Sequence, residues 1–295
     1  VLKKYQNISR KGGWPQLNKG KTLRQGSSDL ERISILRKRL LLSGDLKPKS
    51  NAINKFDVNL LKAVKRFQYR HGLFVDGIVG RRTQEALDDP VEHRIRQIKN
   101  NLNRKLWKNG TSDPQHILVN IADLKLSVIE KSHIINEMRV IVGKDYRQTP
   151  LFSEKIRSIV LNPYWYIPET VILEDLLPEI KKDLNYLKKN HIELFSTWKG
   201  EFYTIAPEVI EWDTLDSYNL NFQFRQMPGP HNSLGRFKFI FPNDHAVYLH
   251  STPNLSIFKM QSRTYSSGCI RIEDPVWLAN YLTKNLVNSS RKKLL

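Results

Sequence analysis

Two neighbouring segments carry the strongest signal in the sequence: Tyr248-Leu249-His250-Ser251-Thr252-Pro253 and Ser266-Ser267-Gly268-Cys269-Ile270-Arg271. Cys269 is the only cysteine among the 295 residues, and it directly follows a Ser-Ser-Gly turn. His250 precedes it by 19 positions (269 minus 250), at the end of a predicted strand. Cysteine catalysis needs a thiolate, a base or cation that generates it, and hydrogen-bond donors for the oxyanion. The segments therefore predict a nucleophilic cysteine, with close backbone approach at Gly268 and positive charge at Arg271.

On spacing alone, other interpretations stay open. A lone cysteine is most often a small buried apolar residue, and any of the 8 histidines could be the partner. A single thiol does exclude an intramolecular disulfide and a cysteine-rich zinc site.

The spacing resembles the signature of the L,D-transpeptidases (the YkuD-type catalytic domain). That signature is a His, a gap about as long as residues 251–265 of this chain, and then Ser/Thr-His-Gly-Cys. Ser267 stands where the common pattern has His, as is frequent in the large periplasmic subgroup, and this leaves His250 as the base. Further segments resemble the same subgroup: Met227–Phe239, Asn162-Pro163-Tyr164-Trp165, Val142-Gly143-Lys144 and Thr149-Pro150.

The resemblance implies a role for each site residue. Cys269 is the nucleophile, and His250 generates its thiolate, so a depressed thiol pKa is expected. The oxyanion and orienting groups are expected from Gly268, Ser251 and Ser267, with the Ser251 carbonyl orienting the imidazole. Candidates for substrate binding are Tyr248, Asn232 and Arg271.

The implied reaction is attack on a peptidoglycan tetrapeptide stem at the third, diamino-acid residue. Terminal D-Ala leaves, a thioester remains, and a side-chain amine of a second stem forms the cross-link. Water as acceptor gives carboxypeptidase activity, and a lysine of a wall-linked lipoprotein is a further open acceptor. The thioester retains the acyl activation, so no cofactor or metal is expected.

Residues 27–90 predict a small three-helix module. Ile33, Leu36 and Leu40 recur at helical spacing, as do Leu60, Val64 and Phe67. Ala63-Val64-Lys65-Arg66-Phe67-Gln68, followed by Gly72-Leu73 and Asp76-Gly77, resembles the type 1 peptidoglycan-binding domain.

The expected fold class is α+β: this helical module plus a mixed β-sandwich catalytic domain of the YkuD type with a helical capping insertion. Residues 1–26 are expected to be an extended lead-in, 91–114 a helical connector, and 115–295 the catalytic domain, with the insertion at about 162–225. Short β-branched runs predict strands at His116–Ile121, Lys125–Glu130, Met138–Val142, Ile156–Leu161, Phe237–Phe241 and Ala246–His250. The insertion is rich in aromatic residues, which either pack it onto the sheet or exclude water from the thioester.

Positive charge is concentrated near the N-terminus. The chain holds 48 Lys+Arg and 29 Asp+Glu, a formal net charge of +19. Residues 1–100 hold 23 and 9 of these, a net +14, and residues 101–295 hold 25 and 20, a net +5. Such a segment attracts nucleic acid, anionic lipid or an acidic wall polymer. The basic residues among the helical positions, including Arg37, Arg39 and Arg70, form either a solvated face or a binding surface.

Three rivals to the transpeptidase stay open. A sortase-like cysteine transpeptidase also uses His, Cys and Arg, but the Ser-Ser-Gly-Cys turn and the wall-binding module favour the L,D-transpeptidase. A non-catalytic wall adaptor is disfavoured if a carbapenem labels Cys269, as it does in family members. Nucleic-acid binding ranks last because the sequence contains no motif for it.

The resemblance also implies export to the periplasm or cell envelope. Residues 1–25 lack an apolar signal core, and the chain begins with Val1, so a signal or membrane anchor upstream stays open. No apolar run approaches the ~18 residues of a membrane span.

Overall fold

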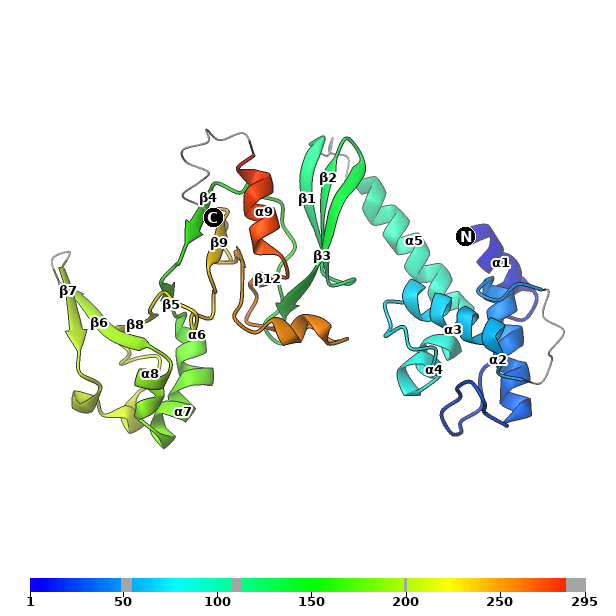
Figure 1. The fold of residues 1–295 in the computed structure, drawn as a ribbon, viewed down its shortest axis with the longest axis horizontal. Helices are drawn as coiled ribbons and strands as arrows, with labels where there is room; N and C mark the ends of the chain where they lie inside the picture. Colours follow the sequence, from blue (N-terminus) through cyan, green and yellow to red (C-terminus); the bar gives the residue numbers. More distant parts are fainter. Residues whose placement is uncertain (49–54, 108–112, 199–200, 285–295) are drawn as a thin grey trace. The chain divides into compact units, whose positions relative to one another are not determined.

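The computed structural model describes residues 1–48, 55–107, 113–198 and 201–284. It divides into two units, Val1–Ser112 and Asp113–Leu295. The first unit is helical, in blue to cyan in Figure 1: α1 (Leu2–Arg10), α2 (Leu30–Ser43), α3 (Val58–Arg70), α4 (Arg81–Asp88) and α5 (Val91–Trp107). The predicted connector helix corresponds to α5, and residues 108–112 of that connector lie outside the described residues.

The ends of α2 and α3 follow from local chemistry. Asp29 accepts a hydrogen bond from the Arg32 amide at the start of α2, and Gly44 ends that helix in the left-handed conformation at φ 88°. The apolar residues of α2 and α3 share one buried cluster with Leu87 of α4. The three predicted helices of the module are therefore confirmed.

The expectation of an extended lead-in at residues 1–26 is wrong for its first part, because α1 spans Leu2–Arg10. Tyr5 and Ile8 of α1 are buried in a cluster with Trp14 and Val91. The Tyr5 and Trp14 rings meet edge to face, with centroids 5.5 Å apart. The helix is thus stabilised by contacts with α5, far along the chain, which local sequence does not reveal.

The second unit is built on one mixed sheet of eight strands, in the order β1-β2-β3-β12-β10-β9-β4, with β11 paired to β3. Strands β10 and β12 run parallel, as do β11 and β3, and the other neighbours are antiparallel. The strands are β1 (Gln115–Asn120), β2 (Lys125–Glu130), β3 (His133–Gly143), β4 (Ser158–Leu161), β9 (Phe237–Ile240), β10 (Leu249–His250), β11 (Thr264–Ser266) and β12 (Ile270–Ile272). The sequence predicted all of these except the short β11 and β12.

One face of this sheet is apolar. Alternate residues of the central strands, including Phe237, Phe239, Leu249, Ile270 and Ile272, lie in one buried cluster with Leu278 and Ala279 of α9 (Pro275–Leu282). The residues between them therefore face the opposite side. The α+β class, with a helical module and a mixed, sheet-rich domain, is confirmed.

The insertion is not only helical, as the sequence analysis expected. It holds α6 (Glu169–Val171), a π-helical turn at Ile172–Leu176, α7 (Leu177–Lys182), α8 (Asn185–Lys189) and 3-10 turns at Pro207–Val209 and Trp212–Thr214. It also holds a second sheet, ordered β5-β8-β6-β7: β5 (Trp165–Tyr166), β6 (Ile192–Trp198), β7 (Glu201–Ile205) and β8 (Gln223–Gln226). The helices and one face of this sheet share an apolar cluster that contains Ile172, Ile180, Leu194 and Phe224. In Figure 1 the helices lie beside the β6–β7 hairpin. None of the helices among the described residues is long and apolar enough to cross a bilayer.

Candidate active site

Three polar residues form a row across the non-core face of the central sheet. His250 of β10 is in register with Lys238 of β9 on one side and with Arg271 of β12 on the other. Each lies between two core residues of its strand or next to one, so strand alternation directs all three away from the core. Two cations thus flank the imidazole.

Tyr248 comes directly before β10, two residues before His250. Cys269 comes directly before β12, two residues before Arg271. The amide of Ile270 donates to the Tyr248 carbonyl, N···O 3.1 Å, and this holds the two chains side by side. The Tyr248 and His250 rings meet edge to face, with centroids 5.6 Å apart. The structure therefore brings Cys269, Tyr248, His250 and Arg271 together.

The thiol is in a different state from the one expected. Burial raises the pKa of Cys269, and this outweighs the hydrogen bonding of Tyr248 and the charges of Lys238 and Arg271, which lower it. The predicted depressed pKa is therefore wrong for the free protein. The free energy needed to remove the thiolate from water exceeds the stabilisation that these groups give it.

The imidazole of His250 is buried and neutral. Burial lowers its pKa from 6.5 to about 3, and the nearby charge of Arg271 acts in the same direction. Nδ1 lies 2.6 Å from the Ser251 carbonyl, as the sequence analysis expected. An Nδ1–H that donates to this carbonyl leaves Nε2 as the basic nitrogen.

Thiol and imidazole are not in direct hydrogen-bond contact. Sγ of Cys269 lies 3.9 Å from the Ala246 carbonyl, and Tyr248 hydrogen-bonds to the sulfur. A neutral thiol beside a neutral base is a general-base arrangement instead of a preformed ion pair.

Lys238 is a site residue that sequence reasoning did not single out. Its Nζ lies 4.0 Å from the centroid of the Tyr248 ring. Burial lowers the pKa of Lys238, and the negative charge of the Cys269 thiolate opposes this shift. Arg271 Nε is buried and has no hydrogen-bond partner within the described part of the chain. No carboxylate is among the groups that shift either cation. The alternation Phe237-Lys238-Phe239 was the available signal, but only strand register places Lys238 beside His250.

Tyr248 remains a phenol. Burial raises its pKa above the ordinary range, the thiol adds to this shift, and hydrogen bonding with Trp165 of β5 opposes it. Tyr248 is therefore a hydrogen-bond donor next to the thiol, and its partner Trp165 comes from the insertion.

The turn before Cys269 is fixed by its own side chains and by a neighbouring loop. Ser266 Oγ donates to the Cys269 carbonyl at 2.5 Å and accepts from the Gly268 amide at 3.2 Å. Thr149 Oγ1 donates to the Gly268 carbonyl at 2.8 Å. Gly268 has φ 113°, a conformation that requires glycine. The Gly268 amide is thus engaged within the turn, which leaves the Cys269 amide as the backbone donor for an oxyanion.

Three of the predicted residues have other contacts. Ser251 Oγ donates to the Leu234 carbonyl at 2.9 Å, and Ser267 Oγ accepts from Arg147 at 2.8 Å. Asn232 is fully buried, and its amide nitrogen donates to the carbonyls of Pro163 and Met227. The polar atoms of Asn232 are engaged by its own loop and by the Pro163 segment, which favours a structural role over substrate contact.

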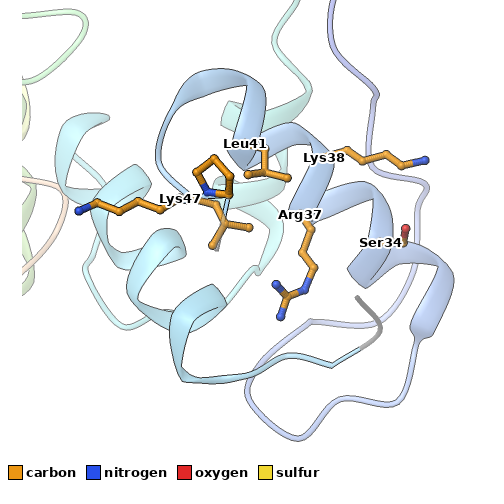
Figure 2. Close-up of a pocket in the computed structure, with 7 residues that line it drawn as sticks. Ser34, Arg37, Lys38, Leu41 and Lys47 are labelled. Carbon is orange, nitrogen blue, oxygen red and sulfur yellow. The ribbon is translucent and has the colours of Figure 1, made fainter. Parts of the chain in front are cut away.

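A hollow of about 130 Å³ lies in the first unit (Figure 2). Its lining is basic and apolar: Ser34, Arg37, Lys38, Leu41, Leu46, Lys47 and Pro48. Within the ranges that the structure describes, no group of three or more His, Cys, Asp or Glu side chains could hold a metal ion.

Comparison with protein families assigns both units. The model of the L,D-transpeptidase catalytic domain, YkuD, matches residues 114–288, more than half of the chain. The chain therefore belongs to the YkuD family of L,D-transpeptidase catalytic domains. The model "Putative peptidoglycan binding domain" matches residues 30–87, within the helical unit.

A curated relative agrees with the family. The chain is 38% identical over 168 residues to a "Putative L,D-transpeptidase" of Haemophilus influenzae, a match that covers 57% of this chain and 33% of the relative. The chain thus spans about a third of the length of that relative.

Two solved structures were also found. An L,D-transpeptidase from Xylanimonas cellulosilytica has 14% identity and a TM-score of 0.24, and covers 91% of this chain and 93% of that one. A fused Zn-dependent amidase/peptidase with a peptidoglycan-binding domain from Clostridium acetobutylicum has 18% identity and a TM-score of 0.21, and covers 48% and 72%. With TM-scores this low, neither supports a conclusion about this chain.

Proposed function

We propose that this protein is a peptidoglycan L,D-transpeptidase that works through a Cys269 thioester. Cys269 Sγ attacks the carbonyl of the third residue of a tetrapeptide stem, and the bond to terminal D-Ala breaks. The amine of a second stem then attacks the thioester, forms the cross-link and frees the thiol. The observation that carries this proposal is the grouping of thiol, neutral imidazole and phenol on one sheet face between two cations.

His250 is the general base and acid of this proposal. Its lowered pKa keeps the imidazole neutral at physiological pH, ready to take the thiol proton as the sulfur attacks. The same proton then passes to the departing D-Ala amine. Thiol and imidazole are out of hydrogen-bond reach without substrate, and such contacts often tighten only in the substrate complex.

Lys238, Arg271 and Tyr248 stabilise negative charge in the proposal. Both cations and Tyr248 lower the pKa of the thiol, so they favour the thiolate once it forms. The Cys269 amide and the Tyr248 hydroxyl are donors for the oxyanion of the tetrahedral intermediate. No carboxylate is among the groups that shift the pKa of Lys238 or Arg271, so in the proposal both cations attract the anionic stem peptide.

The helical unit brings the enzyme to its polymer in this proposal. Its match to a peptidoglycan-binding family and its net positive charge both suit an acidic wall, and they support a location in the periplasm or cell envelope. A second stem is the proposed acceptor, with water and a wall-linked lipoprotein as alternatives that the assay distinguishes.

Incubation with purified disaccharide-tetrapeptide, followed by mass spectrometry, tests the proposal. We expect a disaccharide-tripeptide adduct on the peptide that contains Cys269, release of D-Ala, and a cross-linked dimer. A sorting-signal peptide is the control for sortase-like chemistry, and a carbapenem is expected to label Cys269. An unmodified Cys269 with no D-Ala release would refute the proposed function.

A further inference from the structure

We propose that Arg147 is a positioning residue that ties the capping insertion to the turn that carries the nucleophile. The inference rests on the proposed function. It adds a mechanical link by which the position of the insertion sets the position of Cys269. Arg147 lies in the loop between β3 and β4, outside both parts that it connects.

One end of the link lies on the insertion. Arg147 Nη1 lies 2.7 Å from Asp175 Oδ2, and Nη2 pairs with Glu174 and lies 3.4 Å from the Thr170 carbonyl. Glu174 and Asp175 belong to the π-helical turn Ile172–Leu176. Such turns are rare and are frequent at functional sites. The Arg147 side chain is only 11% exposed, while Glu174 and Asp175 are 57% and 38% exposed, so the guanidinium is shielded from solvent and the acids are partly screened.

The other end of the link lies on the nucleophile turn. The same Nη1 donates to Ser267 Oγ at 2.8 Å, two residues before Cys269. Thr149, two residues after Arg147, donates to the Gly268 carbonyl at 2.8 Å. The short loop therefore holds both residues that precede the nucleophile.

The loop itself has little freedom to move. Gly143 N donates to Thr149 Oγ1 at 3.0 Å, and a Cβ at Gly143 would lie 2.1 Å from the Arg147 carbonyl oxygen. The close packing fixes the backbone from which the Arg147 side chain projects. A planar guanidinium can hold two acids and a hydroxyl at once in this geometry, which the single ammonium of lysine cannot.

The link acts through position and not through charge at the sulfur. Besides burial, the main groups that shift the pKa of Cys269 are Tyr248, Lys238 and Arg271, and Arg147 is not one of them. Misplacement of a reacting group by about 1 Å can cost ~100-fold in rate. Loss of the link is therefore expected to lower kcat while the pH dependence of thiol reactivity stays the same.

The experiment cuts each end of the link separately in the full chain. Glu174→Gln with Asp175→Asn removes the insertion end, Ser267→Ala removes the turn end, and Arg147→Met removes both. We expect ~10-fold to 100-fold lower kcat in Arg147→Met and in the Glu174→Gln, Asp175→Asn double variant. The midpoint of the iodoacetamide alkylation profile should not change, and Arg147→Lys should restore little activity. Combining Ser267→Ala with the double variant should add little, because both act through one arginine.

Two controls match the changes in type. Glu179→Gln removes an acid of the insertion that pairs with Lys182 on the surface. Arg139→Met removes an arginine that pairs with Glu273 on the main sheet. Both should retain wild-type kcat. A decrease in Arg147→Met no larger than in Arg139→Met, or fully additive effects of the two ends, would overturn the inference.

Hydrogen exchange separates this inference from the proposed function. If wild-type protein releases no D-Ala, the proposed function fails, and protection of the amides at residues 266–269 still reports the link. Faster exchange there in the Glu174→Gln, Asp175→Asn variant supports the link, and unchanged exchange refutes it.

Discussion

The two units of this protein bury basic side chains in opposite ways. In the helical unit, the partly exposed Arg70 and the buried Arg39 have acceptors, although Arg39 Nη1 has no hydrogen-bond partner among the described residues. Arg70 donates to both carboxylate oxygens of Asp45, at 3.0 and 2.7 Å, and Arg39 donates to the Leu87 carbonyl and lies 3.6 Å above the Trp14 ring. In the catalytic unit, the described residues provide no carboxylate for Lys238 or Arg271.

This difference separates structural charge from functional charge. Burial of Asp45 raises its pKa, but the hydrogen bonds of Arg70 and Ser43 outweigh this and lower it, so the carboxylate is ionised and neutralises its partner. Among the described residues, Lys238 and Arg271 have no such carboxylate partner. Their charges act instead on the Cys269 thiol and the His250 imidazole. The two predicted roles of the basic residues, a solvated face or a binding surface, thus do not apply to Arg39 and Arg70. These two side chains hold the helices together.

The largest effect is expected from Cys269→Ala. The variant should form no acyl-enzyme and release no D-Ala, because the site has no other nucleophile of this kind. Thermal unfolding should stay close to wild type, since alanine removes only the sulfur and its contacts with the Ala246 carbonyl and Tyr248. Mass spectrometry after incubation with tetrapeptide measures the adduct. Turnover comparable to wild type would contradict a cysteine mechanism, and Lys238 and Arg271 would then have no nucleophile to assist.

The converse change is Asp45→Asn in the helical unit. It leaves Arg70 without its carboxylate, and it should lower the free energy of unfolding by about 3 kcal/mol, at the low end for a buried pair because Arg70 is partly exposed. Urea denaturation followed by circular dichroism measures this change. Hydrolysis and cross-linking of free tetrapeptide should be unaffected, with Asp183→Asn, an exposed acid of the insertion, as the control.

Sequence predicted those parts of the molecule that depend on local chemistry. The helices of the module and the strands with β-branched residues follow from residues close in the chain, and the family signature singles out His250 and Cys269. Helix α1 could not be predicted in this way because Tyr5 and Ile8 pack on Val91. The second sheet of the insertion, the row of Lys238 beside His250, and the burial that raises the thiol pKa all depend on tertiary contacts.

A smaller effect is expected from Lys238→Met. Removal of this charge takes away one of the groups that lower the pKa of Cys269, so the pKa should rise further. Because less thiolate is then present at neutral pH, alkylation by iodoacetamide should be ~10-fold slower. The rate constant measured against pH should show a single rise that is displaced to higher pH. Lys189→Met on α8 is the matched control, and an unchanged profile in Lys238→Met would remove Lys238 from the reactive group.

The smallest effect concerns a feature that the two units share. His71, at the end of α3, resembles His250: burial lowers its pKa from 6.5 to about 4, and Nδ1 lies 2.8 Å from the Phe67 carbonyl. Its ring stacks on Phe67 with centroids 3.9 Å apart. Because the unfolded chain binds the proton more tightly, stability falls as the pH drops from 6.5 towards about 4.

For His71, partial exposure reduces the expected loss of stability to about 1 kcal/mol. His71→Gln should flatten the acid dependence of unfolding in the helical unit and leave D-Ala release unchanged. His250→Gln should abolish D-Ala release, because the imidazole of His250 is the proposed base for Cys269. Within the described part of its own unit, the imidazole of His71 has no thiol beside it. Urea titrations at pH 7, 6, 5 and 4.5 measure the first effect, and the tetrapeptide assay measures the second. If His71→Gln also removed activity, burial of a neutral imidazole would not distinguish a structural from a catalytic histidine in this protein.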